Sequence, residues 1–125
     1  MRTFFLLFAI MFNHLDAQRL SKDGPNVQDA QFAGGQEQLS NFFAQHLRYP
    51  EKAAVRHIEG SVVVTFTVDA QGAVRNVKIR NGLGHGCDQE AQRLVQSLPR
   101  WEPATINGRP VACGKTVRVE FRMAL

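Results

Sequence analysis

The sequence of 125 residues has no long hydrophobic run, few cysteines and no cluster of charge of one sign. Its longest apolar run, Phe4 to Phe12, has nine residues, whereas a helix that spans a membrane needs roughly 20. The 15 Lys and Arg residues and 11 Asp and Glu residues are scattered and give a formal net charge of +4. Proteins that bind nucleic acid gather their basic residues on one face, so we expect no nucleic-acid partner.

Motifs for metal binding and catalysis are also missing. The two cysteines, Cys87 and Cys113, do not form the paired C-x-x-C spacing of a zinc site, so we expect no metal. Thiol catalysis by Cys87 would need a nearby base, and His85, His57 or His46 could supply one in principle. No spacing singles out such a pair, and no Ser/His/Asp group or carboxylate pair stands nearby. The sequence therefore predicts that the chain is not an enzyme and holds no cofactor.

The stretch NGLGHGCDQEA, residues 81–91, lies between a strand-like and a helix-like segment and could suggest a phosphate-binding loop. In the dinucleotide fingerprint G-x-G-x-x-G the third glycine would fall at Cys87, but here Gly86 comes one residue early. No Lys-Ser or Lys-Thr pair of the P-loop kind follows. We therefore predict no nucleotide and only a tight turn into a helix, with Asp88 as the N-cap.

Residues 1–17 resemble a secretory signal peptide. They combine Arg2, the short apolar run and a small residue, Ala17, at the expected cleavage point. Cleavage after Ala17 would export the chain; the alternative is an uncleaved anchor in the inner membrane.

Export changes the reading of the two cysteines. In an oxidising compartment Cys87 and Cys113 can form a disulfide, whereas the alternative is two buried free thiols. The sequence leaves both readings open because the geometry of the pair is not visible in it.

The chain divides into residues 18–35, which are polar and are expected to be irregular, and a domain over residues 36–125. Leu39, Phe42, Phe43 and Leu47 predict a helix from Gln36 to Leu47, because they recur on one helical face. Pro50 suits the first turn of a second, short helix over residues 51–57.

Two strands follow. Residues 61–68, SVVVTFTV, alternate in polarity and place Val62, Val64, Phe66 and Val68 on one face. A turn over residues 69–72 leads into a strand over residues 73–80, which predicts a hairpin.

A helix beginning at Asp88 and a last strand complete the domain. Ala91, Leu94, Val95 and Leu98 mark the apolar side of the helix, and Pro99 ends it. Residues 115–123, KTVRVEFRM, alternate again. The order of elements predicts an α+β fold with helices packed on one face of the sheet.

The last strand is expected to lie at a sheet edge. Its outward positions carry charge at Arg118, Glu120 and Arg122, which commonly protects an edge against unwanted pairing. A free edge can also accept a partner peptide by strand addition, so both roles stay open.

Several motifs in a fixed order resemble the TonB C-terminal domain family, over residues 31–125. They are Tyr49-Pro50 with Ala53 and Ala54, Glu59-Gly60 before VVVTFTVDAQGAVRNVKI, Glu90-Ala91, LPRWEP at residues 98–103, NGRPV at residues 107–111 and the final VRVEF. The segment Phe32–Gly35 with its helix resembles the form found in Bacteroidetes-type proteins. The resemblance implies a three-stranded antiparallel sheet with helices on one face.

The resemblance also implies a partner and a site. In that family the domain binds a short peptide, the TonB box, at the periplasmic end of outer-membrane transporters, as an added strand. The corresponding positions here are His46, Arg48, Tyr49, Lys115, Thr116, Val117, Arg118, Val119, Glu120, Phe121, Arg122 and Met123. We expect a periplasmic protein-binding module linked to TonB-dependent transport.

The alternative is an envelope adapter that binds another periplasmic protein or forms a homodimer through the edge strand. A complete transducer also has a membrane helix and a Pro-rich spacer, and this sequence shows neither. We therefore do not expect energy transduction to transfer with the resemblance.

Overall fold

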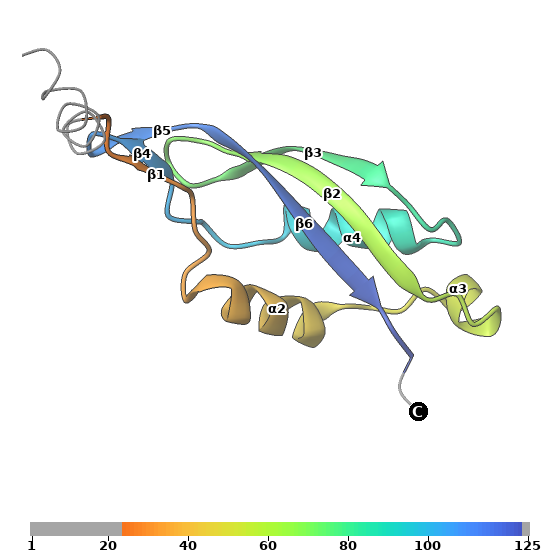
Figure 1. Ribbon diagram of the computed structural model, residues 1–125. Coiled ribbons are helices and arrows are strands. Elements are labelled where there is room, and N and C mark those ends of the chain that lie inside the picture. Colours follow the sequence, from red (N-terminus) through yellow and green to blue (C-terminus); the bar gives the residue numbers. More distant parts are fainter. Residues whose placement is uncertain (1–23, 124–125) are drawn as a thin grey trace, which may run out of the picture.

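The computed structural model describes residues 24–123, which form an α+β domain (Figure 1). The elements in chain order are β1 (Val27–Gln28), α2 (Gly35–His46), α3 (Glu51–Val55), β2 (Gly60–Val68), β3 (Val74–Asn81), α4 (Cys87–Gln96), β4 (Ala104–Ile106), β5 (Arg109–Val111) and β6 (Cys113–Phe121). The predicted helices and the three longer strands are all present, with ends that differ by one to a few residues. The signal-peptide prediction lies outside the described residues.

The main sheet has three antiparallel strands in the order β3-β2-β6. Its centre is β2, and Val62, Val64, Phe66 and Val68 are buried as the alternation predicts. β6 pairs with β2 from Gly60↔Phe121 to Val68↔Cys113 without a shift of register. The last strand therefore lies at an edge of the sheet.

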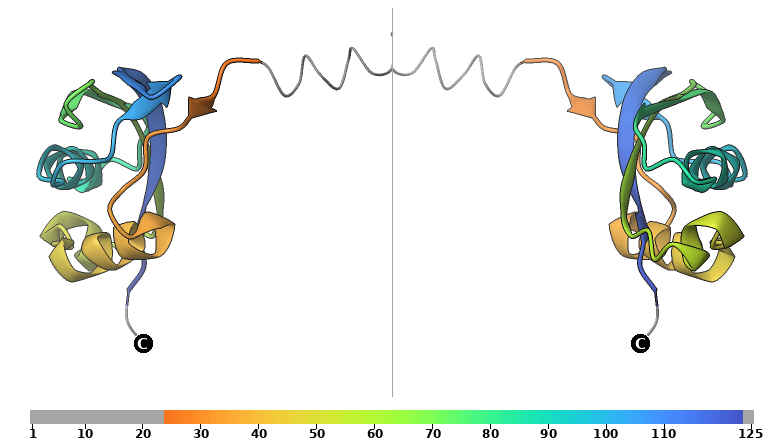
Figure 2. Two further views of the ribbon diagram at one scale, coloured as in Figure 1. Left: turned by 90° about the vertical axis from the view of Figure 1, so that its left-hand side faces the viewer. Right: turned by 90° about the vertical axis from the view of Figure 1, so that its right-hand side faces the viewer.

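The helices cover one face of this sheet (Figure 2). α4 packs against β3 and β2, and it buries Ala91, Leu94 and Val95. α2 buries Leu39 and Phe43 and lies on the side of β6. The opposite face of the sheet carries the alternate, more polar residues of the strands, so the fold is a two-layer α/β sandwich.

A second, smaller sheet was not predicted. Its strands have the order β1-β4-β5, with Val27 opposite Ile106. The expectation that residues 18–35 are irregular is therefore wrong for Val27–Gln28. Beyond this strand, Ala30 and Phe32 are buried in the core. The pairing was missed because a two-residue strand shows no period, and its partner is about 80 positions away in the chain.

The β2–β3 hairpin is fixed by its turn and by Trp101. The Asp69 carboxylate accepts hydrogen bonds from the N–H groups of Gln71 and Ala73, both at 2.9 Å. Gly72 has φ +85°, and a Cβ there would lie 2.1 Å from the Trp101 carbonyl oxygen. The Trp101 N–H donates to the Gly72 carbonyl at 2.8 Å, so the turn and the buried tryptophan hold each other in place.

The glycine-rich loop before α4 is a turn whose amides are already occupied. The Asp88 carboxylate accepts from the N–H groups of Leu83, at 2.7 Å, and Gly84, at 3.2 Å. The prediction that Asp88 is the N-cap is wrong. α4 begins at Cys87, and Gly86 caps it with φ 88°, because the Asp88 side chain reaches back into the loop instead.

The disulfide reading is not supported, because Cys87 and Cys113 are both free thiols. Cys113 begins β6, whereas Cys87 lies near Tyr49, whose ring packs against Phe121 at the other end of the strand. A nine-residue strand is about 26 Å long, and a disulfide needs Cα atoms within about 7 Å. The two cysteines are therefore too far apart to bond.

Candidate functional site

The free edge of β6 is the most distinctive surface of the domain. One side of the strand pairs with β2, and within residues 24–123 no strand pairs with the other side. Side chains alternate along it: Val119 and Phe121 are buried, whereas Thr116, Arg118 and Glu120 are exposed. The regular backbone presents N–H and C=O groups that an extended peptide could use.

Helix α2 lies beside this edge, so that β6 and α2 face each other across a groove. Three adjoining hollows follow β6 from its start to its end. The first, here called the Trp101 hollow, has a volume of 320 Å³ and lies between residues 29–36, Leu39, Trp101 and Lys115–Val117. The middle hollow, 680 Å³, is lined by Gln36, Ser40, Arg118 and residues of the outer sheet face. The last, 140 Å³, lies between Phe43, Leu47 and Glu120. Together they form a groove along the edge.

Tyr49 lies beside the end of β6. Its ring packs edge-on against Phe121, with centroids 5.7 Å apart, and its hydroxyl donates to the Ile58 carbonyl. Burial, followed by the nearby charges of Glu59 and Cys87, raises the pKa of the phenol. Tyr49 is therefore held in place by the core beside the end of β6.

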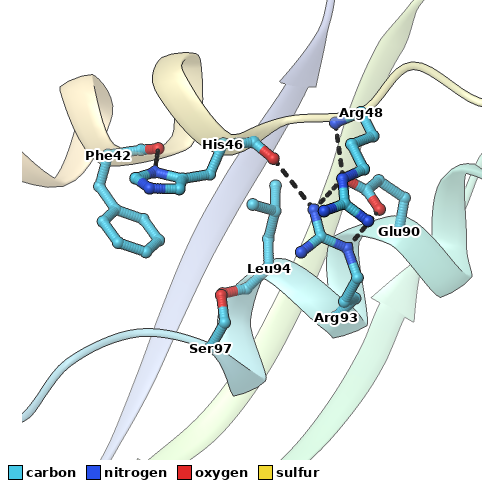
Figure 3. Close-up of polar contacts among 7 residues, drawn as sticks. All are labelled: Phe42, His46, Arg48, Glu90, Arg93, Leu94 and Ser97. Carbon is cyan, nitrogen blue, oxygen red and sulfur yellow. Dashed lines mark hydrogen bonds and ion pairs between the residues drawn. The ribbon is translucent and has the colours of Figure 1, made fainter.

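A buried carboxylate fixes the segment between α2 and α3 (Figure 3). Glu90 accepts a hydrogen bond from the Arg48 N–H at 2.7 Å and two from Arg93, at 2.8 and 2.7 Å. Arg93 also donates to the His46 carbonyl at 3.0 Å. α4 thus holds the backbone of residues 46–48, which the sequence assigned to the partner site.

The charge of Glu90 matters for these contacts. Burial raises the pKa of the Glu90 carboxyl, but the hydrogen bonds from Arg93 and the Arg48 N–H, with the charges of both arginines, outweigh it, and the net pKa is lowered. The carboxylate is therefore charged at neutral pH. The His46 ring, by contrast, stacks on Phe42 with centroids 4.2 Å apart and is exposed.

Lys115 differs from the other charged residues of β6, Arg118 and Glu120, because it lies on the strand face that is turned toward the helices. Its ammonium group pairs with Asp29 at 2.7 Å and lies 5.9 Å from the centre of the Trp101 ring. The hydrogen bond from Lys115 lowers the pKa of the Asp29 carboxyl. Lys115 therefore joins the start of β6 to the segment that precedes α2.

The outward residues of β6 form only exposed contacts. Glu120 accepts from the Ser61 hydroxyl at 2.8 Å and pairs with Arg122 at 3.1 Å. Beyond the strand, the Met123 N–H donates to Glu59 at 2.7 Å. These residues remain accessible on the outer face.

The structure thus places the predicted residues of β6 along one groove, with Tyr49 packed against Phe121 at the end of the strand. Sequence reasoning missed Glu90, Arg93 and residues 29–36. Glu90 left a signal, because a charged residue stood three positions after Cys87 and four before Leu94, on the apolar side of the helix. Residues 29–36 left none, because they carry no periodic pattern.

Two further properties concern the described part of the chain. Within residues 24–123, no helix is long and apolar enough to cross a membrane. The same residues contain no group of three or more His, Cys, Asp or Glu side chains that could hold a metal ion.

Comparison with known proteins identifies the family. Residues 45–123 match the family described as "Gram-negative bacterial TonB protein C-terminal". The chain belongs to the TonB C-terminal family. This family is non-enzymatic and its C-terminal domain faces the periplasm, which agrees with the expectation that the chain is not an enzyme.

The relatives of this TonB C-terminal domain are longer proteins. It is 50% identical over 70 residues to "Protein TonB" of Helicobacter pylori strain 26695, covering 52% of the chain and 25% of the relative. It is also 50% identical over 32 residues to the protein of the same name in strain J99, covering 26% of the chain and 11% of the relative. The chain thus spans about a quarter or less of the length of the curated relatives it matches.

A solved structure shares the fold. The solution structure of the H. pylori TonB C-terminal domain superposes with a TM-score of 0.52 at 22% identity, over 68% of this chain and 89% of that one. The α+β fold with antiparallel three-stranded sheets is therefore that of a TonB C-terminal domain.

Proposed function

We propose that this domain binds an extended peptide of the TonB-box type, from an outer-membrane transporter, by strand addition along β6. The observation that carries the proposal is the unpaired edge of a nine-residue strand that stays in register with β2 throughout. Family membership supports the connection to TonB-dependent transport.

The contact surface would be residues 115–123 with His46, Arg48 and Tyr49. Each backbone hydrogen bond contributes about 1 kcal/mol, whereas ordering each peptide residue costs about 1–2 kcal/mol. Backbone pairing alone would therefore bind weakly, and the walls of the groove would have to supply the rest. The held backbone of residues 46–48 and the half-buried Tyr49 would keep the segment after α2 rigid when the peptide enters.

Strand addition can be tested by an NMR titration of the signal-free protein. The titrants are N-terminal peptides of outer-membrane transporters from the same genome. We expect amide shifts in residues 113–123 and around Tyr49, with new protection from hydrogen exchange at alternate residues of β6. No shifts at millimolar peptide would contradict the proposal.

A matched control uses the peptide rather than the protein. N-methylation removes one peptide N–H at a time and leaves every side chain in place. In strand addition the N–H groups of alternate peptide residues face β6, so alternate N-methyl peptides should lose affinity at least ten-fold. Equal losses at every position would indicate side-chain recognition without strand pairing.

Export belongs to the same proposal. Residues 1–17 would act as a signal peptide that is cleaved after Ala17. The intact mass of the protein from a periplasmic fraction tests this directly. A mass that includes Met1 would instead favour an uncleaved inner-membrane anchor.

The second candidate function is self-association or adapter binding through the same edge. The free groups of β6 suit a second copy of the chain as well as a peptide. Shifts in β6 that grow with protein concentration, before any peptide is added, would favour the homodimer. A competing envelope protein would show as loss of the peptide-induced shifts.

A further inference from the structure

The Trp101 hollow contains a buried hydrogen-bond donor that has no acceptor. Trp101 is 5% exposed, and its indole Nε1 has no hydrogen-bond partner within residues 24–123. An unpaired buried N–H destabilises the folded state, so native proteins rarely contain one. Trp101 lines the hollow of 320 Å³, so a side chain that enters this hollow would bring an acceptor to the tryptophan.

The charged groups of the hollow form a balanced pair. Lys115 and Asp29 both line it, and their side chains lie 2.7 Å apart. Because Asp29 stays charged, an incoming carboxylate would gain from Lys115 but would be repelled by Asp29. An incoming ammonium group would be attracted by Asp29 but repelled by Lys115. A neutral side chain that both accepts and donates would suit the pair best, and a primary amide does both.

The hollow is placed to receive a side chain from an added strand. Lys115 and Val117 both line the hollow, and both lie on the face of β6 that faces the helices. Residues directly opposite each other on neighbouring strands project to the same face of a sheet. A peptide paired with β6 would therefore direct alternate side chains to this face, one of them beside Lys115.

We propose that the Trp101 hollow selects a Gln or Asn side chain at one position of the bound peptide. This inference rests on the proposed strand addition. The amide oxygen would accept from Lys115 and the indole N–H, and the amide NH₂ would donate to Asp29. The indole nitrogen is covered in the free protein, so neighbouring side chains shift on binding.

The hollow also extends beyond the matched family region. Asp29 and Gln36 precede residue 45, where the family match begins. The Gln31 N–H donates to the Glu102 carbonyl at 2.9 Å and the Glu102 N–H returns to Gln31 at 2.8 Å, which fixes this wall next to Trp101. The selectivity would therefore be a property of this chain and its near relatives.

A positional scan tests the proposal. The probes are ten-residue peptides of alternating Thr and Val, with a single Gln, Leu, Glu or Lys moved along the sequence. At one position we expect Gln to bind about five-fold more tightly than Leu or Glu, as one or two added hydrogen bonds would give. Trp101 is the only tryptophan of the chain, so its fluorescence should change with this Gln and not with Leu.

Variants then connect the preference to the hollow. Trp101→Phe and Lys115→Met should each reduce the Gln preference to about two-fold, whereas Lys78→Met, on the exposed surface of β3, should leave it unchanged. Asp29→Asn removes the repulsion from a residue whose side chain is 66% exposed, so the fold is retained. In that variant Glu should bind at least as tightly as Gln.

The outcomes separate the two proposals. Shifts in β6 without a Gln preference at any position would overturn the amide pocket and leave strand addition intact. A preference that survives both Trp101→Phe and Lys115→Met would also overturn it. No β6 shifts with these peptides or with the transporter peptides would overturn both proposals together.

Discussion

The two edges of the main sheet differ in how regular their backbones are. β6 keeps one register with β2 over nine pairs, from Gly60↔Phe121 to Val68↔Cys113. β3 has eight residues and two irregularities. Arg80 has no partner on β2, and Asn76 and Val77 together lie opposite Phe66. Asn76 has φ 55°, in the left-handed region. Bulges bend an edge and interrupt its free hydrogen-bonding groups.

The comparison shows that backbone bulges protect the β3 edge, here called the protected edge. The regular β6 edge, here called the receptive edge, is left open. The exposed residues Arg75, Lys78 and Arg80 add like charges to the protected edge. β6 has exposed charges too, but they are of both signs and the strand is regular. Side-chain charge alone therefore does not distinguish the edges, whereas backbone regularity does.

The receptive edge depends most on the core beneath it. Phe121→Ala removes a fully buried ring at the end of β6, against which Tyr49 packs. We expect the free energy of unfolding to fall by about 3–5 kcal/mol, measured by urea denaturation. Val55→Ala, at a residue that is 70% exposed, is the matched control and should cost less than about 0.5 kcal/mol. A loss below about 1 kcal/mol for Phe121→Ala would contradict this packing.

The wall of the receptive edge depends on Glu90. Glu90→Ala leaves Arg93 and the Arg48 N–H without their acceptor, so we expect a loss of about 2–3 kcal/mol at pH 7. Glu90→Gln keeps an acceptor for Arg48 without the charge and should lose less.

The pH dependence follows from the lowered pKa of Glu90. Its stabilisation is fully present above the ordinary value of 4.5 and is lost as the pH falls through the lower pKa of the folded state. Denaturation curves at several pH values should therefore show the difference between the parent and Glu90→Ala narrowing as the pH falls below 4.5. A constant difference down to pH 3 would show that the charge of Glu90 does not matter.

Deleting Asn76 would remove one of the two irregularities of the protected edge. Two residues, Asn76 and Val77, oppose Phe66 alone, so the deletion keeps every other side chain on its face. The stability should change by only about 1 kcal/mol, because relief of the left-handed residue offsets local repacking. The deletion should nevertheless increase self-association through β3, seen by sedimentation. Unchanged association would mean that this bulge is not what protects the edge, and that charge or the irregularity at Arg80 does so.

The exposed charges of the receptive edge should matter least. Glu120→Ala removes contacts to Arg122 and Ser61 that are all on the surface. Exposed pairs contribute about 0–1 kcal/mol, so stability should change by less than about 0.5 kcal/mol and peptide affinity by less than three-fold. A ten-fold loss of affinity in the NMR titration would show that this side chain, rather than the backbone, recognises the peptide.

The sequence predicted the elements whose pattern is local. The alternation in residues 61–68 and the apolar stripe of α4 were enough to place β2 and that helix, because each buries one face. The edge position of the last strand was also predicted. The two bulges of β3 were not, because an extra residue in an alternating strand is visible only once its partner is known.

The remaining misses have one physical cause, which is contact between distant residues. β1 and β4 are too short to show a period, and Pro110 and Gly108 hide β4 and β5 within a turn-rich stretch. The sequence left the Cys87–Cys113 disulfide open, because the distance in space between the two cysteines cannot be seen from their positions in the chain. The Trp101 hollow combines residues 29–36 with the start of β6, which no local pattern connects.

The pairing of β2 with β6 also sets the order in which the chain can fold. β2 is the centre of the sheet, yet one of its two neighbours is the last strand in the chain, about 50 residues later. A nascent chain that ends before residue 113 leaves one side of β2 without a partner and lacks the core residues Val119 and Phe121. Folding of the main sheet must therefore wait for β6, and the loop closed by this pairing slows it. Until β6 has left the ribosome or a translocation pore, β2 lacks the strand that covers one of its sides.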